Sequence, residues 1–160
     1  MAEDAASRAI DLASGKGHEY LLCQLHQILG RVYGSNGEKE KAIHHFETAI
    51  RIASPFNWHD ILFWTHYSLA LLFLDKDEFD DASTHITRAK KHAVNDAYQL
   101  GSAVESQAKV WYRQRSLEDA KTEALHALQI YESLWLEKDV ARCRNLLQKV
   151  KRAKESGKLV

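Results

Sequence analysis

The hydrophobic residues of this chain recur three and four positions apart along almost its whole length. Because an α-helix completes a turn every 3.6 residues, this spacing places them on one side of each of several helices. No segment shows the strict alternation of apolar and polar residues that indicates a β-strand. We expect eight helices, at residues 2–13, 18–34, 38–53, 58–74, 78–94, 97–112, 117–134 and 138–154. The pattern therefore predicts an all-α protein.

Short polar stretches mark the joints between these helices. Residues 35–37 read Ser-Asn-Gly, and the glycine can take the positive φ that a tight turn requires. Pro55 ends the helix before it, because the residue that precedes a proline avoids the helical region. Ser116, with Asp119 three residues later, predicts a side-chain cap for the helix at 117–134.

Residues 61–74, ILFWTHYSLALLFL, form the most apolar run in the sequence and lie close to its centre. The run is shorter than the roughly 20 residues that a helix needs to cross a bilayer, so we expect no membrane span. A helix that is apolar on nearly every side must be covered by its neighbours instead. The acidic stretch at 75–81, DKDEFDD, suits the first turn of the next helix and lacks the glycine and distal glutamate of an EF-hand loop, so we interpret it as a cap.

The chain repeats itself with offsets of 40 and then 38 residues. In each copy, four small or apolar positions follow one another at intervals of 12, 4 and 3 residues. The three copies are Gly30, Ala42, Phe46 and Ala49; Ala70, Ala82, Ile86 and Ala89; and Ala108, Ala120, Ala124 and Ala127. Two helices of a hairpin can approach closely only where the side chains are small. We therefore expect the small residue of each first helix to meet the first alanine of the second.

This pattern resembles the tetratricopeptide repeat family, whose units carry Leu-Gly-x2-Tyr, then Ala-x3-Phe, then alanine and proline. The first copy matches best, with LGRVY at residues 29–33 and AIHHF at residues 42–46. The position of the family's tryptophan is held by His26, His66 and Val104. The period of 38 to 40 residues exceeds the usual ~34, so the chain resembles a longer-period branch of the family.

The resemblance implies a right-handed superhelical array of antiparallel helix hairpins in a single domain, residues 1–160. The three complete repeats would be residues 18–55, 57–95 and 96–134. Residues 1–16 would supply one helix of a preceding unit, and residues 137–155 a helix that caps the last apolar face. It also implies a protein–protein interaction module, part of a larger scaffold or regulatory protein.

In arrays of this family, the first helix of each hairpin lines a concave groove that holds a peptide or helix of a partner. By register, the resemblance places in this groove Gln24, Gln27, Arg31, Trp64, Tyr67, Leu71, Ser102, Glu105, Lys109 and Tyr112. An apolar centre flanked by two cations suits a partner with an apolar anchor and an acidic flank. The alternative is that adjoining helices cover Trp64, Tyr67 and Leu71.

The same register assigns roles to other residues of the apolar run at 61–74. Leu69, Ala70 and Phe73 belong to the hairpin core, and Leu74 falls at the groove. Some relatives hold the C-terminal carboxylate of chaperones with a clamp of lysine, asparagine and arginine. The corresponding residues here are Gln27, Arg31, Ser68, Ser102 and Ser106, so this clamp is absent.

Composition and charge narrow the classes of partner. The 160 residues are 45% hydrophobic with one proline, which suits a compact helical protein. Lys+Arg and Asp+Glu both number 22, so no net charge attracts nucleic acid or an anionic membrane. The C-terminal stretch is basic, with Arg142, Arg144, Lys149, Lys151, Arg152, Lys154 and Lys158. It has no interleaved aromatic residues, so we interpret it as a solvated cap and expect neither a nucleic-acid nor a membrane partner.

The chain shows no arrangement of residues typical of catalysis or metal binding. Nine histidines are present. His44 and His45 are adjacent and so point to different sides of a helix, while His59 and His66, like His85 and His92, are seven residues apart, too far to chelate one ion without further ligands. No phosphate-binding, metalloprotease or nucleophile-elbow motif occurs. We expect no enzymatic activity, no metal and no cofactor. Self-association through the open ends of the array is the first alternative to partner binding, and an RNA-binding or enzymatic domain comes after it.

The two cysteines bear on the cellular compartment. Cys23 and Cys143 lie on helical patterns without zinc-ligand spacing, and no secretory signal precedes them. We expect reduced thiols in a cytoplasmic protein, with a disulfide between them left open because their pairing depends on the fold.

Overall fold

The computed structural model describes residues 8, 10, 13 and 17–157. Within these residues it contains seven α-helices, one 3-10 helix and no strand, which confirms the all-α prediction. The helices are α2 (Glu19–Ser35), α3 (Lys39–Ala53), η1 (Ser54–Phe56), α4 (His59–Asp75), α5 (Phe79–His92), α6 (Ala97–Arg113), α7 (Leu117–Ser133) and α8 (Glu137–Gly157). The helix expected at 2–13, and almost all of the partial unit 1–16, lie outside the described residues.

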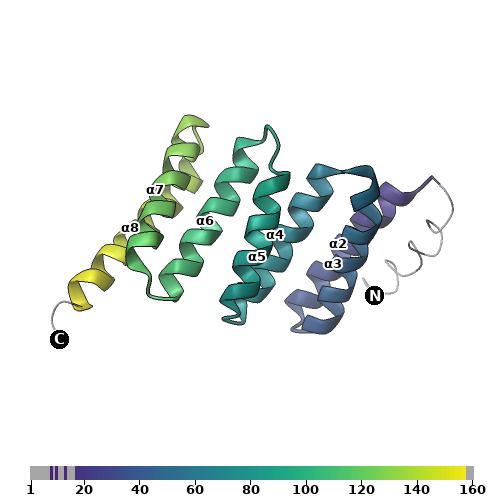
Figure 1. Cartoon of the computed structure of the whole chain (residues 1–160), viewed down its shortest axis with the longest axis horizontal. Helices are drawn as coiled ribbons and strands as arrows, with labels where there is room; N and C mark the ends of the chain where they lie inside the picture. The colour runs from purple at the N-terminus through teal and green to yellow at the C-terminus, as the bar shows by residue number, and fades with distance from the viewer. Residues whose placement is uncertain (1–7, 9, 11–12, 14–16, 158–160) are drawn as a thin grey trace.

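The helices pack as successive antiparallel hairpins in a row, from α2 at one end of the long axis to α8 at the other (Figure 1). The closest pairs are α2 with α3, α4 with α5, and α6 with α7, while α8 packs against α7. The helices α2, α4, α6 and α8 also touch one another in sequence, so they form one layer. This arrangement is an all-α solenoid, as the repeat predicted.

One kind of turn joins the two helices of every hairpin. The residue at its tip has a positive φ, and the amide of the next residue donates to the carbonyl five positions back. These bonds run from Glu38 to Tyr33, Glu78 to Phe73, Ser116 to Trp111 and, between α7 and α8, Leu136 to Tyr131. Glycine holds the tip at Gly37 only; Asp77, Arg115 and Trp135 take the same conformation. A common turn explains the regular spacing of the array.

The repeated small positions lie in the cores of the hairpins, and all of their alanines are at most 1% exposed. The expected partner of Gly30 was wrong: the ring of Phe46, four residues beyond Ala42, covers it. A Cβ atom on Gly30 would lie 2.6 Å from that ring. In the third hairpin Ala108 likewise clusters with Ala124. In the first and third hairpins the contact is therefore centred one turn further along the second helix than the sequence suggested, whereas in the second hairpin Ala70 clusters with both Ala82 and Ile86.

One local expectation needs correction. Ser116 makes no side-chain cap to α7. The side-chain cap occurs instead at Asp96, whose Oδ1 accepts from the amide of Gln99 at 2.9 Å at the start of α6. In the central helix Leu69 and Ala70 are core residues as expected, and Leu74 is largely buried, at 6% exposure.

The two cysteines are free thiols in separate core clusters, so the disulfide left open by the sequence is not formed. Burial raises the pKa of both Cys23 and Cys143 to about 11, which keeps the thiols protonated near neutral pH. Across residues 17–157, none of the helices combines the length and the apolar character that crossing a membrane requires.

Candidate functional site

Three cavities follow one another along the layer formed by α2, α4, α6 and α8. The first, of about 350 Å³, is lined by Gln27, Arg31, Trp64 and Ser68. The second, of about 270 Å³, shares Arg31 and Ser68 with it and continues to Leu71. The third, of about 760 Å³, shares Asp75 with the second and extends to α8. We call these three neighbouring cavities the first-helix groove.

The end of the groove near α2 is aromatic. The side chain of Trp64 remains 39% exposed although it lies in the most apolar helix. Its ring is held edge-on against Phe63, with the centroids 4.9 Å apart, and lies 6.5 Å from the exposed ring of Tyr98 on α6. Arg31 is exposed beside it and has no ion-pair partner among residues 17–157. An indole with a free guanidinium beside it is a typical anchor point for a protein partner.

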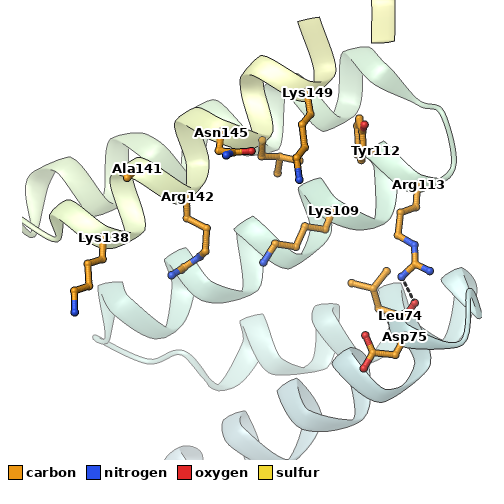
Figure 2. A pocket seen from close by; sticks show the side chains of 11 residues that line it. Leu74, Asp75, Lys109, Tyr112, Arg113, Lys138, Ala141, Arg142, Asn145 and Lys149 are labelled. Atoms are coloured by element: carbon orange, nitrogen blue, oxygen red, sulfur yellow. Dashed lines mark hydrogen bonds between the residues drawn. The ribbon is translucent and has the colours of Figure 1, made fainter. Parts of the chain in front are cut away.

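The other end of the groove is basic. Figure 2 shows α8 forming one wall with Lys138, Arg142 and Lys149, while α6 and the end of α4 form the other. The lining residues are Leu74, Asp75, Lys109, Tyr112, Arg113, Lys138, Ala141, Arg142, Asn145, Leu146 and Lys149. Five of these carry a positive charge and one a negative charge. The cavity therefore favours an anionic group.

Not all five cations are available to a ligand. Arg113 donates to the carbonyl of Leu74 (Figure 2). It also pairs with Asp77 at 2.6 Å. Lys138 and Lys149 have no hydrogen-bond or ion-pair partner among residues 17–157. These two lysines supply the uncompensated positive charge at this end of the groove.

Glu105 occupies the floor between α6 and α8, and its side chain is only 3% exposed. Arg142 binds its carboxylate through two hydrogen bonds of 2.7 and 2.6 Å, and Lys109 pairs with it at 2.7 Å. The hydroxyl of Tyr131 donates to the same carboxylate at 3.2 Å. Burial alone would raise the pKa of Glu105, but the bonds from Arg142 and Lys109 outweigh it and lower the pKa.

The sequence placed Glu105 in the groove as a partner-binding residue, and the structure corrects this. Its carboxylate is already bound by cations of the chain itself and lies beneath them. It therefore orients Lys109 and Arg142 instead of facing a ligand. Arg142 lies 48% exposed above it, so the guanidinium still borders the cavity.

The structure brings most of the other predicted residues to the groove, but in different roles. Gln27 borders it while its amide donates to the Ile61 carbonyl at 2.9 Å and to the Thr65 hydroxyl at 2.6 Å. Tyr67 is half-buried against the core of the second hairpin and accepts from Ser106 at 3.4 Å. Gln24 is exposed and lines none of the three cavities. Five of the predicted residues line these cavities: Arg31, Trp64, Leu71, Lys109 and Tyr112.

Sequence reasoning missed the contribution of α8. The predicted capping helix lines the groove because it continues the layer of α2, α4 and α6. The second offset of the repeat, 38, would lead from positions 102, 105 and 109 to Val140, Cys143 and Leu147, but the first offset, 40, leads to Arg142, Asn145 and Lys149. All three line the basic cavity.

The class of protein that these observations define is a helical-repeat solenoid with a groove along the first helices of its hairpins. Among solved structures, the chain is similar to BtubC (BKLC) from P. vanneervenii, with a TM-score of 0.77 and 18% sequence identity. The similarity covers 98% of this chain and 70% of that one. At this identity the likeness establishes the fold alone. No protein-family model matches the chain, and no curated protein sequence matches it.

Proposed function

We propose that this chain is a non-catalytic protein-interaction module that binds a peptide segment of a partner in the first-helix groove. The observation that carries the proposal is the combination of an exposed indole at one end with uncompensated lysines at the other. Trp64 offers an apolar anchor point, and Lys138 and Lys149 offer charge for an acidic flank. The tetratricopeptide resemblance points to the same side of the array.

The dimensions of the groove support an extended or helical segment in place of a small molecule. The three cavities run across four helices and are open to solvent, while a small-molecule site encloses most of its ligand. Anchoring side chains along such a surface give affinity, and complementary charge sets the rate and the specificity of association.

The test measures binding of short fluorescent peptides by anisotropy. The peptides share one leucine anchor and differ in carrying acidic, neutral or basic flanks. We expect the acidic peptides to bind best, and Trp64→Ala to weaken their binding about 10-fold. Trp135→Ala is the matched control, because Trp135 is 89% exposed in the α7–α8 turn and lines none of the groove cavities. Equal binding of acidic and basic peptides, or of a single-stranded oligonucleotide as tightly as the acidic peptide, would contradict the proposal.

Self-association is the second candidate, and one apolar surface favours it. Leu125 of α7 is 46% exposed and lines a cavity of about 430 Å³ with Leu147 and Val150. The rim of that cavity is basic, with Lys121, Lys151 and Lys154. Two copies of the same face would repel each other, so stacking would have to join this face to a different one. A monomeric mass in sedimentation equilibrium at high protein concentration would exclude this function.

A further inference from the structure

The hairpins bring histidines into pairs that cross between helices. Nδ1 of His26 lies 2.9 Å from Nδ1 of His45, and the same two positions one repeat later, His66 and His85, are 3.1 Å apart. A third pair, His59 and His92, also has its Nδ1 atoms 3.1 Å apart. Sequence reasoning considered only histidines that share a helix, so it missed all three of these pairs between helices.

The third pair stands at the open end of the second hairpin. His59 is the first residue of α4, and His92 is the last residue of α5. Their rings lie 5.4 Å apart at the surface, and the ring of His92 stacks on that of His66 at 6.0 Å. Because His59 is exposed at the start of its helix, its side chain can move by a few tenths of an ångström without disturbing a core.

The separation of the two nitrogens fits a metal ion. A tetrahedral ion with bonds of about 2.0–2.1 Å to each nitrogen holds the two nitrogens roughly 3.3 Å apart. Neutral imidazole is a preferred ligand of late first-row metals. Among residues 17–157, no cluster of three or more His, Cys, Asp or Glu side chains converges on one point, so water would fill the other positions.

The exposure of His59 separates this pair from the other two, because His26, His45 and His85 are all half-buried. His66 is only 5% exposed. A divalent ion between His66 and His85 would lose its hydrating water, and no carboxylate there would compensate its charge. His59 is exposed and His92 is half-buried, so an ion bound there keeps its remaining water ligands. We propose that His59 and His92 form a two-histidine site for a divalent late transition-metal ion, Zn²⁺, Ni²⁺ or Cu²⁺.

The bound ion cross-links the start of α4 to the end of α5, opposite the turn at residues 76–78. Because unfolding separates these two residues, the ion binds the folded chain and raises its melting temperature. The site is independent of the first-helix groove, and its failure would leave the proposed function untouched.

The test uses the full chain without a histidine tag and records thermal unfolding with nickel chloride. At a nickel concentration about 100 times the dissociation constant, we expect Tm to rise by about 5 to 10 °C. His59→Ala and His92→Ala should each abolish the rise. His126→Ala is the matched control, since His126 is an exposed histidine on α7, and it should keep the rise. An unchanged Tm in the wild-type chain, or a rise that persists in His92→Ala, would overturn the proposal.

A spectroscopic measurement identifies the ligands directly. Electron paramagnetic resonance of the chain with one equivalent of Cu²⁺ should show coupling to two imidazole nitrogens, and to fewer in His92→Gln. Circular dichroism without metal checks that the variants are folded. A spectrum of the wild-type chain without imidazole coupling would mean that the pair is held together by a hydrogen bond alone.

Discussion

The ring of Phe46 lies directly on the backbone of Gly30, so a Cβ atom at position 30 would come within 2.6 Å of it. This contact sets how closely α2 approaches α3. Gly30→Ala should therefore force the ring or the helix to move and lower the free energy of unfolding by about 1–3 kcal/mol, measured by urea denaturation.

Gly34 provides the control for this variant within the same helix. A Cβ atom there would meet Leu72 at 3.5 Å and Ala42 at 3.8 Å, which are ordinary contacts. Gly34→Ala should be neutral or stabilise by up to about 1 kcal/mol, because alanine favours the helix. If both variants changed stability equally, the close approach at Gly30 would not be what limits the hairpin.

Because the carboxylate of Glu105 is buried, we expect that removal of its main partner, Arg142, lowers the free energy of unfolding substantially. Arg142→Met leaves the carboxylate with Lys109 and Tyr131 only, so we expect a loss of about 2–3 kcal/mol in the free energy of unfolding. Chemical denaturation measures this loss. The double variant with Glu105→Gln should recover part of it, since the uncompensated charge is then gone.

Arg144 supplies the comparison for Arg142 on the same helix. It pairs with Glu132 at 2.8 Å, but both side chains are largely exposed, at 66% and 48%. Arg144→Met should change stability by less than about 0.5 kcal/mol. Equal effects of the two substitutions would mean that burial of Glu105 does not govern the strength of its pair.

The sequence predicted those parts of the structure that depend on local periodicity. The seven described helices begin and end close to the predicted bounds, because the 3.6-residue pattern and the turn residues act within one segment. The hairpin array followed from the repeated small positions, since Ala42, Ala82 and Ala120 must be buried where two helices meet. These features require no knowledge of the angles between helices.

Apart from the side-chain cap predicted at Ser116, the errors concern contacts between helices. Glu105 was predicted as exposed because its own helix face points to the groove, yet α8 brings Arg142 over it. The partner of Gly30 was misplaced by one turn because the axial offset of two helices is not encoded in either alone. The histidine pairs have sequence separations of 19 and 33 residues, which carry no periodic signal.

Because His26 is partly buried, we expect the free energy of unfolding to depend on pH. Burial, together with the nearby His45, His44 and Arg51, lowers the pKa of His26 to about 4 in the folded chain, against 6.5 when exposed. Between these two values the unfolded chain binds a proton that the folded chain does not, so the free energy of unfolding falls as the pH falls.

The variant His26→Gln removes this contribution. Between pH 7 and pH 5, we expect the wild-type chain to lose about 1–2 kcal/mol more than His26→Gln, measured by urea denaturation at each pH. His126→Gln, which changes an exposed histidine on α7, should lose as much as the wild type. Parallel pH profiles for the wild type and His26→Gln would show that His26 titrates alike in the folded and unfolded chains.

The basic end of the groove predicts how salt acts on the proposed peptide binding. Lys138 and Lys149 border the largest of the three groove cavities and have no partners among the described residues. Their charge therefore attracts an acidic flank, and salt at 0.1 M screens this attraction over about 10 Å. The double variant Lys138→Glu with Lys149→Glu should bind the acidic peptide at least about 10-fold more weakly and should flatten the dependence of affinity on salt. Anisotropy titrations between low and high salt measure both effects.

Lys151→Glu is the matched control, because Lys151 lies on the same helix but lines the cavity beside Leu125 instead of the groove. If Lys151→Glu weakened binding as much as the double variant, the net charge of the chain, and not the first-helix groove, would account for the preference for acidic peptides.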